Sequence, residues 1–315
     1  MNLLIAGANG FLGSHLCSYF SSQESYNVWA QTRKQPILSK RSIKAIVFDL
    51  NDDLEHIDLS QVDIIVHCAG RAHVMNETES SPLDAYRQIN VKGALNLARK
   101  AAQSGVKRFI YLSSIKVNGE EATQQTPFTA DDQIHTDDPY GLSKYEAEQA
   151  LMKLADETGL EVVIIRPVLI YGPNVKANFK SMVSLATKKI PLPIGCLDNK
   201  RSMVSVFNLT DLIHICMTHP KANREVFLAS DQDDISVKQL FEKLAKWQNN
   251  QLLMLPVPKS LIIFLASLAG KRAVASRLCS ELLVDTTKNT QLLGWTAPYS
   301  VDESLEKMFN TPHTN

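Results

Sequence analysis

Tyr140 and Lys144 are the two residues whose types and spacing point most directly to acid–base chemistry. They stand four positions apart in Tyr140-Gly-Leu-Ser-Lys144, and the preceding Asp138-Pro139 is typical of a helix start. Both side chains should therefore lie on one face of a helix. There the ammonium group is expected to lower the phenol pKa from about 10 toward neutral pH. We expect Tyr140 to act as a general acid or base.

Ser113 and Ser114 supply hydroxyl groups that could complete such a site. They follow the apolar run 109–112, which is expected to form a buried strand. A tyrosine and lysine at this spacing are common by chance, but hydroxyls at a strand end 26 residues earlier make the combination much more specific. The sequence thus predicts a catalytic set of Ser114, Tyr140 and Lys144.

Three glycines near the N-terminus have the spacing of a phosphate-binding turn. They follow the apolar run 3–6 and open the helical pattern 13–20. Glycines permit the tight turn and let backbone N–H groups approach a pyrophosphate at the helix N-terminus. The cofactor-binding residues expected in this loop are Gly7, Asn9, Gly10, Phe11, Leu12 and Gly13.

Two later strand ends stand where the same dinucleotide would need them. Asp49 and Leu50 end the third apolar run, where a carboxylate could accept a hydrogen bond from the adenine amino group. Cys68, Ala69 and Gly70 end the fourth run and would place small side chains beside the cofactor. We expect all five residues at the cofactor site.

The end of the second strand bears on the choice between NAD and NADP. An acidic residue there would accept from the ribose 2′-OH and repel a 2′-phosphate, but the sequence has Gln31-Thr-Arg33-Lys34. Arg33 and Lys34 could bind a 2′-phosphate, which favours NADP over NAD. The alternative is that both are solvated surface cations and that either cofactor is accepted.

The elements that would position these residues alternate between short apolar runs and helix-period stretches. The expected strands are 3–6, 28–30, 45–48, 64–68, 109–112 and 162–165, and the expected helices are 13–20, 83–102 and 140–155. Continuous apolar runs are typical of parallel strands covered on both faces. The alternation predicts an α/β fold, a doubly wound parallel sheet of the Rossmann type with right-handed crossovers.

The pattern changes after Arg166 to proline-rich connections around a helix at 179–187, which indicates a smaller α+β domain. Residues 202–207 and 225–229 have the character of strands that return to the first domain. We expect a dinucleotide-binding domain of 1–166 plus about 202–229. The discontinuous substrate domain is expected at about 167–201 plus 230–315.

Composition excludes several other classes of protein. The 33 basic and 33 acidic side chains cancel, so we expect no global electrostatic attraction to nucleic acid or anionic lipid, and any anion must be bound locally. Five scattered cysteines have no metal-site or disulfide spacing, so we expect no metal and a reducing cytoplasm.

The apolar segment 260–270 is about half the length of a spanning helix. We expect a buried or dimer-facing helix there, the alternative being a surface that rests on a membrane or a partner.

Taken together, these motifs resemble the extended short-chain dehydrogenase/reductase family, specifically its nucleotide-sugar epimerase/dehydratase group. The resemblance covers the whole length and is strongest over residues 1–175. It implies that Ser114 hydrogen-bonds the reacting oxygen, that Tyr140 exchanges its proton and that Lys144 also binds the nicotinamide ribose. It further places Asn90, Ser113, Pro167 and Val168 near the nicotinamide.

The resemblance also suggests residues that would bind a nucleotide sugar. Asn178 and Phe179 match one such segment, and Arg201 is expected to meet the pyrophosphate, since a guanidinium can engage two phosphate oxygens. The alternative for Arg201 is an ordinary salt bridge between the lobes. Members of the family often dimerise through two long helices, so 95–102 and 145–152 are candidates for a homodimer interface.

Three activities remain open at this point. A dehydratase is improbable because the acidic pair of that group is replaced here by Ile115 and Lys116. We favour 4-keto reduction of a UDP-sugar to a UDP-6-deoxy-N-acetylhexosamine for surface polysaccharide. The alternatives are a UDP-glucose or UDP-N-acetylglucosamine 4-epimerase with tightly bound NAD, and a non-catalytic dinucleotide sensor.

Overall fold

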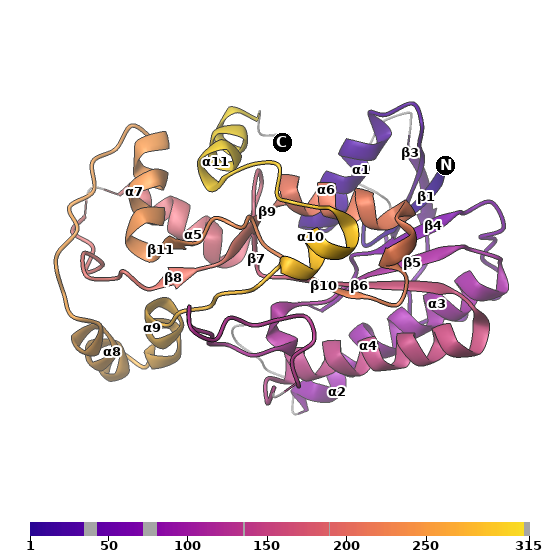
Figure 1. The fold of residues 1–315 in the computed structure, drawn as a ribbon, viewed down its shortest axis with the longest axis horizontal. Helices are drawn as coiled ribbons and strands as arrows, with labels where there is room; N and C mark the ends of the chain where they lie inside the picture. Colours follow the sequence, from indigo (N-terminus) through magenta and orange to yellow (C-terminus); the bar gives the residue numbers. More distant parts are fainter. Residues whose placement is uncertain (35–42, 72–80, 135, 189, 312–315) are drawn as a thin grey trace.

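A parallel β-sheet forms the centre of the protein (Figure 1). The computed structural model describes residues 1–34, 43–71, 81–134, 136–188 and 190–311. Seven strands pair in the order β10-β6-β5-β4-β1-β2-β3, and every pairing is parallel. Their bounds are β1 Asn2–Ala6, β2 Asn27–Thr32, β3 Ile43–Val47, β4 Ile64–His67, β5 Arg108–Leu112, β6 Glu161–Pro167 and β10 Val226–Ala229. The predicted doubly wound sheet is confirmed.

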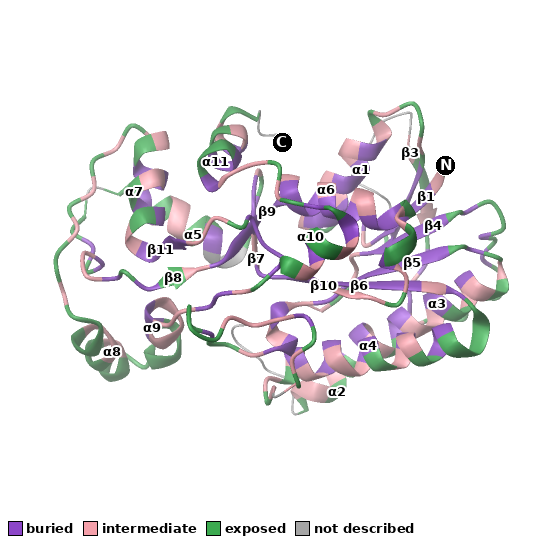
Figure 2. Cartoon of the chain, viewed as in Figure 1, coloured by how far each residue is buried: buried purple, intermediate pink, exposed green. Residues whose placement is uncertain are grey.

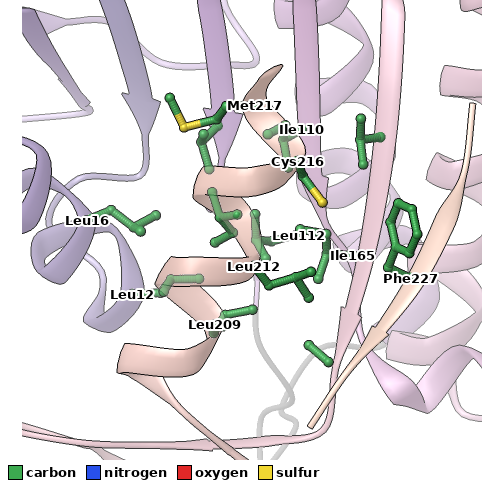
Figure 3. Packing of buried hydrophobic residues seen from close by; sticks show 14 of the residues in the cluster. Leu12, Leu16, Ile110, Leu112, Ile165, Leu209, Leu212, Cys216, Met217 and Phe227 are labelled. Carbon is green, nitrogen blue, oxygen red and sulfur yellow. The ribbon is translucent and has the colours of Figure 1, made fainter. Parts of the chain in front are cut away.

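Helices cover both faces of the sheet, which is why its strands are apolar along their whole length. Along β1, Leu3 and Ile5 point into one core cluster and Leu4 and Ala6 into the other. The first cluster packs under α1 (Phe11–Ser21) and α6 (Val206–Thr218), as Figure 3 shows. The second packs under α3 (Ala94–Gln103) and α4 (Pro139–Thr158).

The sheet order reverses between β1 and β4, because successive strands extend from β1 toward β3 and from β4 toward β10. In open α/β sheets, ligands bind outside the carboxyl ends of the strands at such a switch point. The glycine loop follows β1, and residues 68–70 follow β4. The fold therefore brings both predicted cofactor segments to one crevice.

A second lobe has its own apolar core, centred on residues such as Tyr171, Phe179, Leu240 and Phe241. Two short sheets belong to this part of the chain: β7 (Leu169–Tyr171) with β9 (Met203–Ser205), and β8 (Lys200–Arg201) with β11 (Ile235–Ser236). Its helices are α5 (Ala177–Ala186), α7 (Val237–Trp247), α8 (Lys259–Leu268), α9 (Arg272–Cys279) and α11 (Val301–Asn310).

Two segments after Arg166 were predicted to be strands that return to the first domain. The 225–229 segment is confirmed as the edge strand β10. The 202–207 segment contains the strand β9, but β9 pairs with β7 and not with the main sheet, and Ser205 then caps α6 by accepting a hydrogen bond from the Asn208 backbone N–H. It is α6, a helix, that packs on the sheet. The proposed domain boundaries remain a prediction.

The apolar segment 260–270 also differs from expectation. It forms α8, in which no residue is buried in the single chain, so the prediction of a buried helix is wrong, while a dimer-facing helix stays a prediction. Figure 2 shows this helix largely exposed. No helix within the described part of the chain has the length and apolar character needed to span a bilayer.

The remaining short elements connect the strands and helices around the site. They are α2 (Pro82–Tyr86), the π-helix η1 (Arg87–Gly93), the 3₁₀ turns η2 (Ile115–Val117) and η3 (Pro220–Ala222), and α10 (Thr287–Leu293).

Candidate active site

Ser114 and Tyr140 are brought together by the contact between η2 and the start of α4. Ser114 follows β5 and caps η2, and its side chain is hydrogen-bonded to Tyr140. The Asp138 carboxylate caps α4 by accepting from the Gly141 N–H at 2.9 Å. A Cβ at Gly141 would lie 2.4 Å from the Lys116 carbonyl oxygen, so the two segments touch through backbone. The helix start therefore holds the phenol against the serine hydroxyl.

Lys144 lies one turn further along α4, but it does not act on Tyr140 as expected. Its Nζ donates to the Leu112 carbonyl oxygen at 2.8 Å and lies 4.5 Å from the centre of the Tyr111 ring. Burial lowers the pKa of Lys144 to about 8. Desolvation raises the pKa of Tyr140 to about 12, and the hydrogen bond with Ser114 offsets only part of this rise. The prediction of a lowered phenol pKa is thus wrong for this structure, because burial outweighs the favourable contacts.

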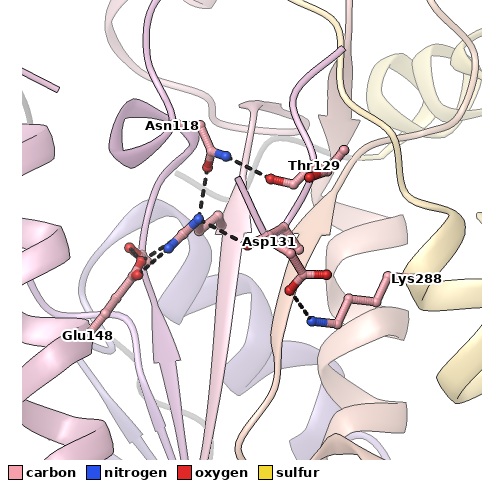
Figure 4. Close-up of polar contacts among 8 residues, drawn as sticks. Asn118, Thr129, Asp131, Glu148 and Lys288 are labelled. Carbon is pink, nitrogen blue, oxygen red and sulfur yellow. Dashed lines mark hydrogen bonds and ion pairs between the residues drawn. The ribbon is translucent and has the colours of Figure 1, made fainter. Parts of the chain in front are cut away.

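A buried ion pair lies beneath these residues and was missed by the sequence analysis. Glu148 on α4 meets Arg166 on β6 through two bonds, Nε to Oε1 at 3.0 Å and Nη2 to Oε2 at 2.6 Å. Ser113 also donates to the Glu148 carboxylate, and Arg166 Nη1 donates to Asn118 Oδ1 at 3.1 Å. Figure 4 shows the part of this network that includes Glu148 and Asn118. The signal available in the sequence was an acidic residue four positions after Lys144, on the same face of the helix.

Asn90 lies within the π-helix η1, a rare geometry that often marks functional sites. Its Nδ2 donates to Ser143 Oγ at 3.0 Å, and its Oδ1 accepts from the Arg71 backbone N–H at 2.8 Å. A Cβ added to Gly70 would lie 3.1 Å from Asn90 Oδ1 and 3.3 Å from Lys144 Nζ. Asn90 and Lys144 therefore flank Gly70.

A cavity of about 740 Å³ opens at the switch point of the sheet, within the size range of cofactor sites. Of the predicted cofactor residues, it is lined by Gly7, Asn9, Gly10, Arg33, Asp49, Leu50, Cys68, Ala69 and Gly70. Lys34, the other candidate 2′-phosphate partner, also lines it, and the residues that sequence reasoning did not assign to it are Gln31, Thr32, Asn51, Arg71 and Ile89. The cavity thus joins the three predicted strand ends and the glycine loop.

The glycine loop has the form that a dinucleotide requires. Gly7 has φ +81°, and a Cβ there would lie 2.7 Å from the Ala69 backbone. A Cβ at Gly13 would lie 2.3 Å from the Gly7 carbonyl oxygen. No side chain caps the N-terminus of α1 at Gly10, so its amides are available to a phosphate. The residues present fit a bound dinucleotide.

Gln31 fastens this loop to the neighbouring strands. Its Oε1 accepts from the Gly7 N–H at 3.0 Å, and its Nε2 donates to the Phe48 carbonyl oxygen at 2.7 Å. Arg33 and Lys34, further along, are exposed. Asp49 Oδ1 accepts from the Asn51 backbone N–H at 2.9 Å, which ties this carboxylate to its own turn.

Several predicted cofactor residues do not line the described cavity. Leu12 is buried and Phe11 packs against the core. Gly13 forms the close backbone contact with Gly7. Ser113, Pro167 and Val168 are buried at the ends of β5 and β6. Their predicted role beside the nicotinamide stays a prediction.

The predicted substrate residues are placed very differently from one another. Phe179 is buried and stacks on Tyr171, with ring centres 5.2 Å apart. Arg201 is half-buried, and its Nη1 donates to the carbonyl oxygens of Arg277 at 2.7 Å and Ser280 at 2.9 Å. The ion pairs described do not include Arg201, so the inter-lobe salt bridge is not seen. Asn178 lies in the first turn of α5, and its side chain is outside the described part of the structure.

Residues 3–229 match the family model described as the NAD dependent epimerase/dehydratase family. The chain belongs to this family. It is therefore an NAD-dependent enzyme of the extended short-chain dehydrogenase/reductase type. The motifs predicted this family, whereas the preference for NADP over NAD that was inferred from Arg33 and Lys34 is not supported.

Relatives and solved structures extend the comparison over the whole chain. A Vibrio cholerae protein named UDP-glucose 4-epimerase is 42% identical over 97% of this chain and 94% of its own length. An Escherichia coli O157:H7 protein named N-acetyl-alpha-D-glucosaminyl-diphospho-ditrans,octacis-undecaprenol 4-epimerase is 26% identical over 97% and 93%. The fold matches the UDP-glucose 4-epimerase of Thermotoga maritima, solved with UDP-glucose, with a TM-score of 0.78, 23% identity and coverage of 98% and 97%. It also matches the UDP-glucuronic acid 4-epimerase of Bacillus cereus, solved with NAD, with a TM-score of 0.77, 19% identity and coverage of 98% and 96%.

Proposed function

We propose that this protein is a UDP-sugar 4-epimerase that keeps NAD in the cavity at the switch point of the sheet. The observation that carries the proposal is the hydrogen-bonded pair of Ser114 and Tyr140, with Lys144 one helical turn away beside Gly70 of the cavity wall. The relative from Vibrio cholerae supports epimerisation as the reaction. This proposal replaces the reductase reading favoured from the sequence, which the comparisons do not confirm.

In this proposal the residues around Tyr140 move a proton while the sugar carbon changes its oxidation state. A bound NAD would supply the acceptor for a hydride from C4 of the sugar and the donor for its return to the opposite face. Tyr140 takes the C4 hydroxyl proton and later gives it back, so protons balance over one cycle. Ser114 donates a hydrogen bond to the same oxygen. Because burial raises the phenol pKa to about 12 here, ionisation of Tyr140 would require a stabilising charge from the bound substrate and cofactor, since Lys144 does not act on the phenol in this arrangement.

Arg201 is the residue that we propose to contact the substrate diphosphate. Its Nη1 donates to two carbonyl oxygens of α9 and the residue after it, which orients the guanidinium. Burial lowers the pKa of Arg201, so an anionic partner would be favoured at this position. The UDP-sugar and the diphospho-linked sugar of the relatives' names share a sugar diphosphate, which is the group Arg201 would recognise.

A second candidate is NADPH-dependent reduction of a UDP-4-keto sugar. It is favoured by one observation, the two exposed cations Arg33 and Lys34 in the cavity lining after β2, a strand that does not end in an acidic residue. A non-catalytic sensor is not supported, because Ser114, Tyr140 and Lys144 are all present and Lys144 lies beside Gly70 of the cavity wall.

One experiment separates the two enzymatic candidates. The purified protein is denatured, and any nicotinamide released is measured. UDP-glucose and UDP-N-acetylglucosamine are then assayed for epimerisation, and UDP-4-keto-6-deoxy-N-acetylglucosamine is assayed with NADPH. Copurified NAD with sugar interconversion and no net oxidation is the expected result. Stoichiometric NADPH oxidation by a protein purified without nicotinamide would establish the reductase instead.

The Arg33→Asp substitution tests the cofactor preference. It replaces a candidate 2′-phosphate partner with a repelling charge, so NADP affinity should fall at least tenfold relative to NAD. Lys153→Gln, at an exposed cation on α4, is the matched control. Isothermal titration calorimetry with NADP and with NAD measures the ratio of the two affinities. An unchanged ratio would mean that Arg33 is only a surface cation.

We also propose a homodimer through α3 and α4. The outer positions of these helices fall within the predicted ranges 95–102 and 145–152. Asn96, Arg99, Gln149 and Met152 are exposed or half-buried there.

A further inference from the structure

Helix α8 exposes an apolar stripe, which is unusual for a helix of a globular protein. Leu261, Phe264, Leu265 and Leu268 have exposed fractions of 45%, 58%, 53% and 74%. Their spacing is that of one helix face, a pattern that normally points into a core. Ile262 and Ile263, on the other face, pack against the core of the second lobe. The exposed stripe is therefore additional to the face that holds the helix in place.

This exposure is concentrated in one region. Of the ten large apolar side chains exposed in the described residues, seven lie between Leu253 and Val274. Helix α9 packs against α8 and adds Val274, which is 50% exposed. In Figure 1 the two helices lie at the lower left edge of the molecule, at the end away from the N-terminus. Concentrated apolar exposure of this kind marks an interaction surface.

The charged residues of the segment that carries the stripe are all of one sign. Residues 247–280 contain Lys259, Lys271, Arg272 and Arg277 and no aspartate or glutamate, although the whole chain has 33 of each sign. Lys259, Lys271 and Arg272 are exposed, and they stand at the two ends of α8. A cation in the first turn opposes the helix dipole, so Lys259 is not explained by helix stability. The local charge favours an anionic partner.

We propose that α8 and the start of α9 dock on an anionic lipid bilayer. The α8 patch consists of Leu261, Phe264, Leu265, Leu268 and Val274 with the flanking Lys259, Lys271 and Arg272. An amphipathic helix with apolar and basic side chains can lie in the plane of the interface without spanning the bilayer. Ten residues give α8 a length of about 15 Å, enough for such a contact and too short to cross.

A second copy of the chain fits the patch less well. A twofold interface would set the α8 patch against itself, since such contacts use the same surface on both subunits. The cations of one copy would then face those of the other, and residues 247–280 hold no carboxylate to compensate. A phospholipid surface instead supplies both the apolar layer and the negative charge.

The docking surface adjoins the proposed substrate site. Arg201, the proposed diphosphate contact, donates to the Arg277 carbonyl oxygen of α9 at 2.7 Å. Docking would therefore hold that side of the substrate site close to the membrane. The docking proposal itself stands on α8 and does not rest on the proposed function.

Vesicle cosedimentation tests the proposal with the full-length protein. Vesicles of equal parts phosphatidylglycerol and phosphatidylcholine should bind the protein, and binding should weaken with salt. Vesicles of phosphatidylcholine alone should bind it far less. The triple variant Lys259→Gln, Lys271→Gln, Arg272→Gln should lower the partition coefficient about a hundredfold. Equal binding to both kinds of vesicle, or binding to neither, would overturn the proposal.

A second variant pair tests the apolar stripe. Phe264→Ser with Leu268→Ser should lower binding at least tenfold, whereas Val47→Ser, at an exposed apolar residue of β3, should leave it unchanged. Circular dichroism melts and UDP-sugar turnover of both variants should match those of the unsubstituted protein. Lipid binding and the proposed reaction are thus measured independently, so either proposal can fail without the other. Light scattering after size-exclusion chromatography tests whether a second copy of the chain covers the α8 patch instead. If Phe264→Ser with Leu268→Ser converts an oligomer to a smaller species, a second copy covers the patch and the lipid proposal is wrong.

Discussion

At the scale of single residues, the site depends on two groups whose pKa values are moved by burial. The phenol of Tyr140 is shifted upward to about 12 and the ammonium of Lys144 downward to about 8. Both shifts favour the neutral forms, because desolvation penalises charge. Proton transfer at this site therefore requires bound substrate and cofactor to stabilise the charged forms of Tyr140 and Lys144.

Tyr140→Phe should remove turnover while sparing the fold. The phenol oxygen is the proposed proton carrier, and loss of a general acid or base lowers turnover by about a thousandfold. Cofactor affinity should stay within a factor of about two, because the ring is kept. Steady-state kinetics measure turnover, and nicotinamide titration measures cofactor affinity. Tyr145→Phe, on the same helix, is the control. Full activity in Tyr140→Phe would exclude the proposed mechanism.

Lys144 should make stability depend on pH in a defined window. The folded protein releases this proton near pH 8, whereas the unfolded chain holds it to about pH 10.5. Between these values the unfolded state binds more protons, so the free energy of unfolding rises with pH. Relative to Lys144→Met, the unsubstituted protein should gain up to about 3 kcal/mol across the window. Urea unfolding of both proteins at several pH values measures the difference, and a constant difference would contradict the burial assignment.

At the scale of elements, the site depends on how α4 is fixed to β5 and β6. Glu148 joins α4 to Arg166 of β6 and to Ser113 after β5. Glu148 and Arg166 are 1% and 4% exposed, so neither charge has water as an alternative partner. The network therefore positions the same helix that carries Tyr140 and Lys144.

Glu148→Gln should destabilise the protein by about 3 kcal/mol, because it leaves the buried Arg166 charge without its counterion. It should also lower the pKa of Lys144 further, since the Glu148 charge now favours the ammonium form. Glu157→Gln on the same helix is the matched control, because its ion pair with Lys153 is exposed. That control should change stability by less than about 0.5 kcal/mol. Equal effects of the two substitutions in urea unfolding would refute the positioning role.

At the scale of the whole molecule, two surfaces remain for partners. The outer faces of α3 and α4 lie on the dinucleotide-binding side, and the α8 patch lies on the second lobe (Figure 1). Using α3 and α4 for dimerisation would leave α8 of both protomers available for a bilayer. The two proposals are therefore compatible and can be tested separately.

Met152→Glu tests the proposed dimer. A carboxylate at this half-buried position of α4 would be desolvated in the interface, so dimer affinity should fall at least tenfold. Sedimentation velocity distinguishes the 35.1 kDa protomer from a species of twice that mass. Lys153→Glu, at the neighbouring exposed position, should leave the dimer intact. An unsubstituted protein that sediments as a monomer would exclude the interface.

Local sequence patterns by themselves determined most of the fold and the components of the site. Hydrophobic periodicity, which depends on neighbouring residues, predicted six strands of the main sheet and the helices between them. The backbone freedom of glycine predicted the glycine turn. Ser114, Tyr140 and Lys144 could be selected because a strand end and a helix turn set their directions.

Only the tertiary structure decided the features that depend on residues far apart in the chain. Gln31 holds Gly7, Glu148 meets Arg166, and β9 pairs with β7 instead of the main sheet. The lowered pKa of Tyr140 and the burial of α8 within the chain were predicted wrongly for the same reason. Burial is a property of the assembled chain: the same apolar or titratable side chain is solvated or desolvated according to what packs against it.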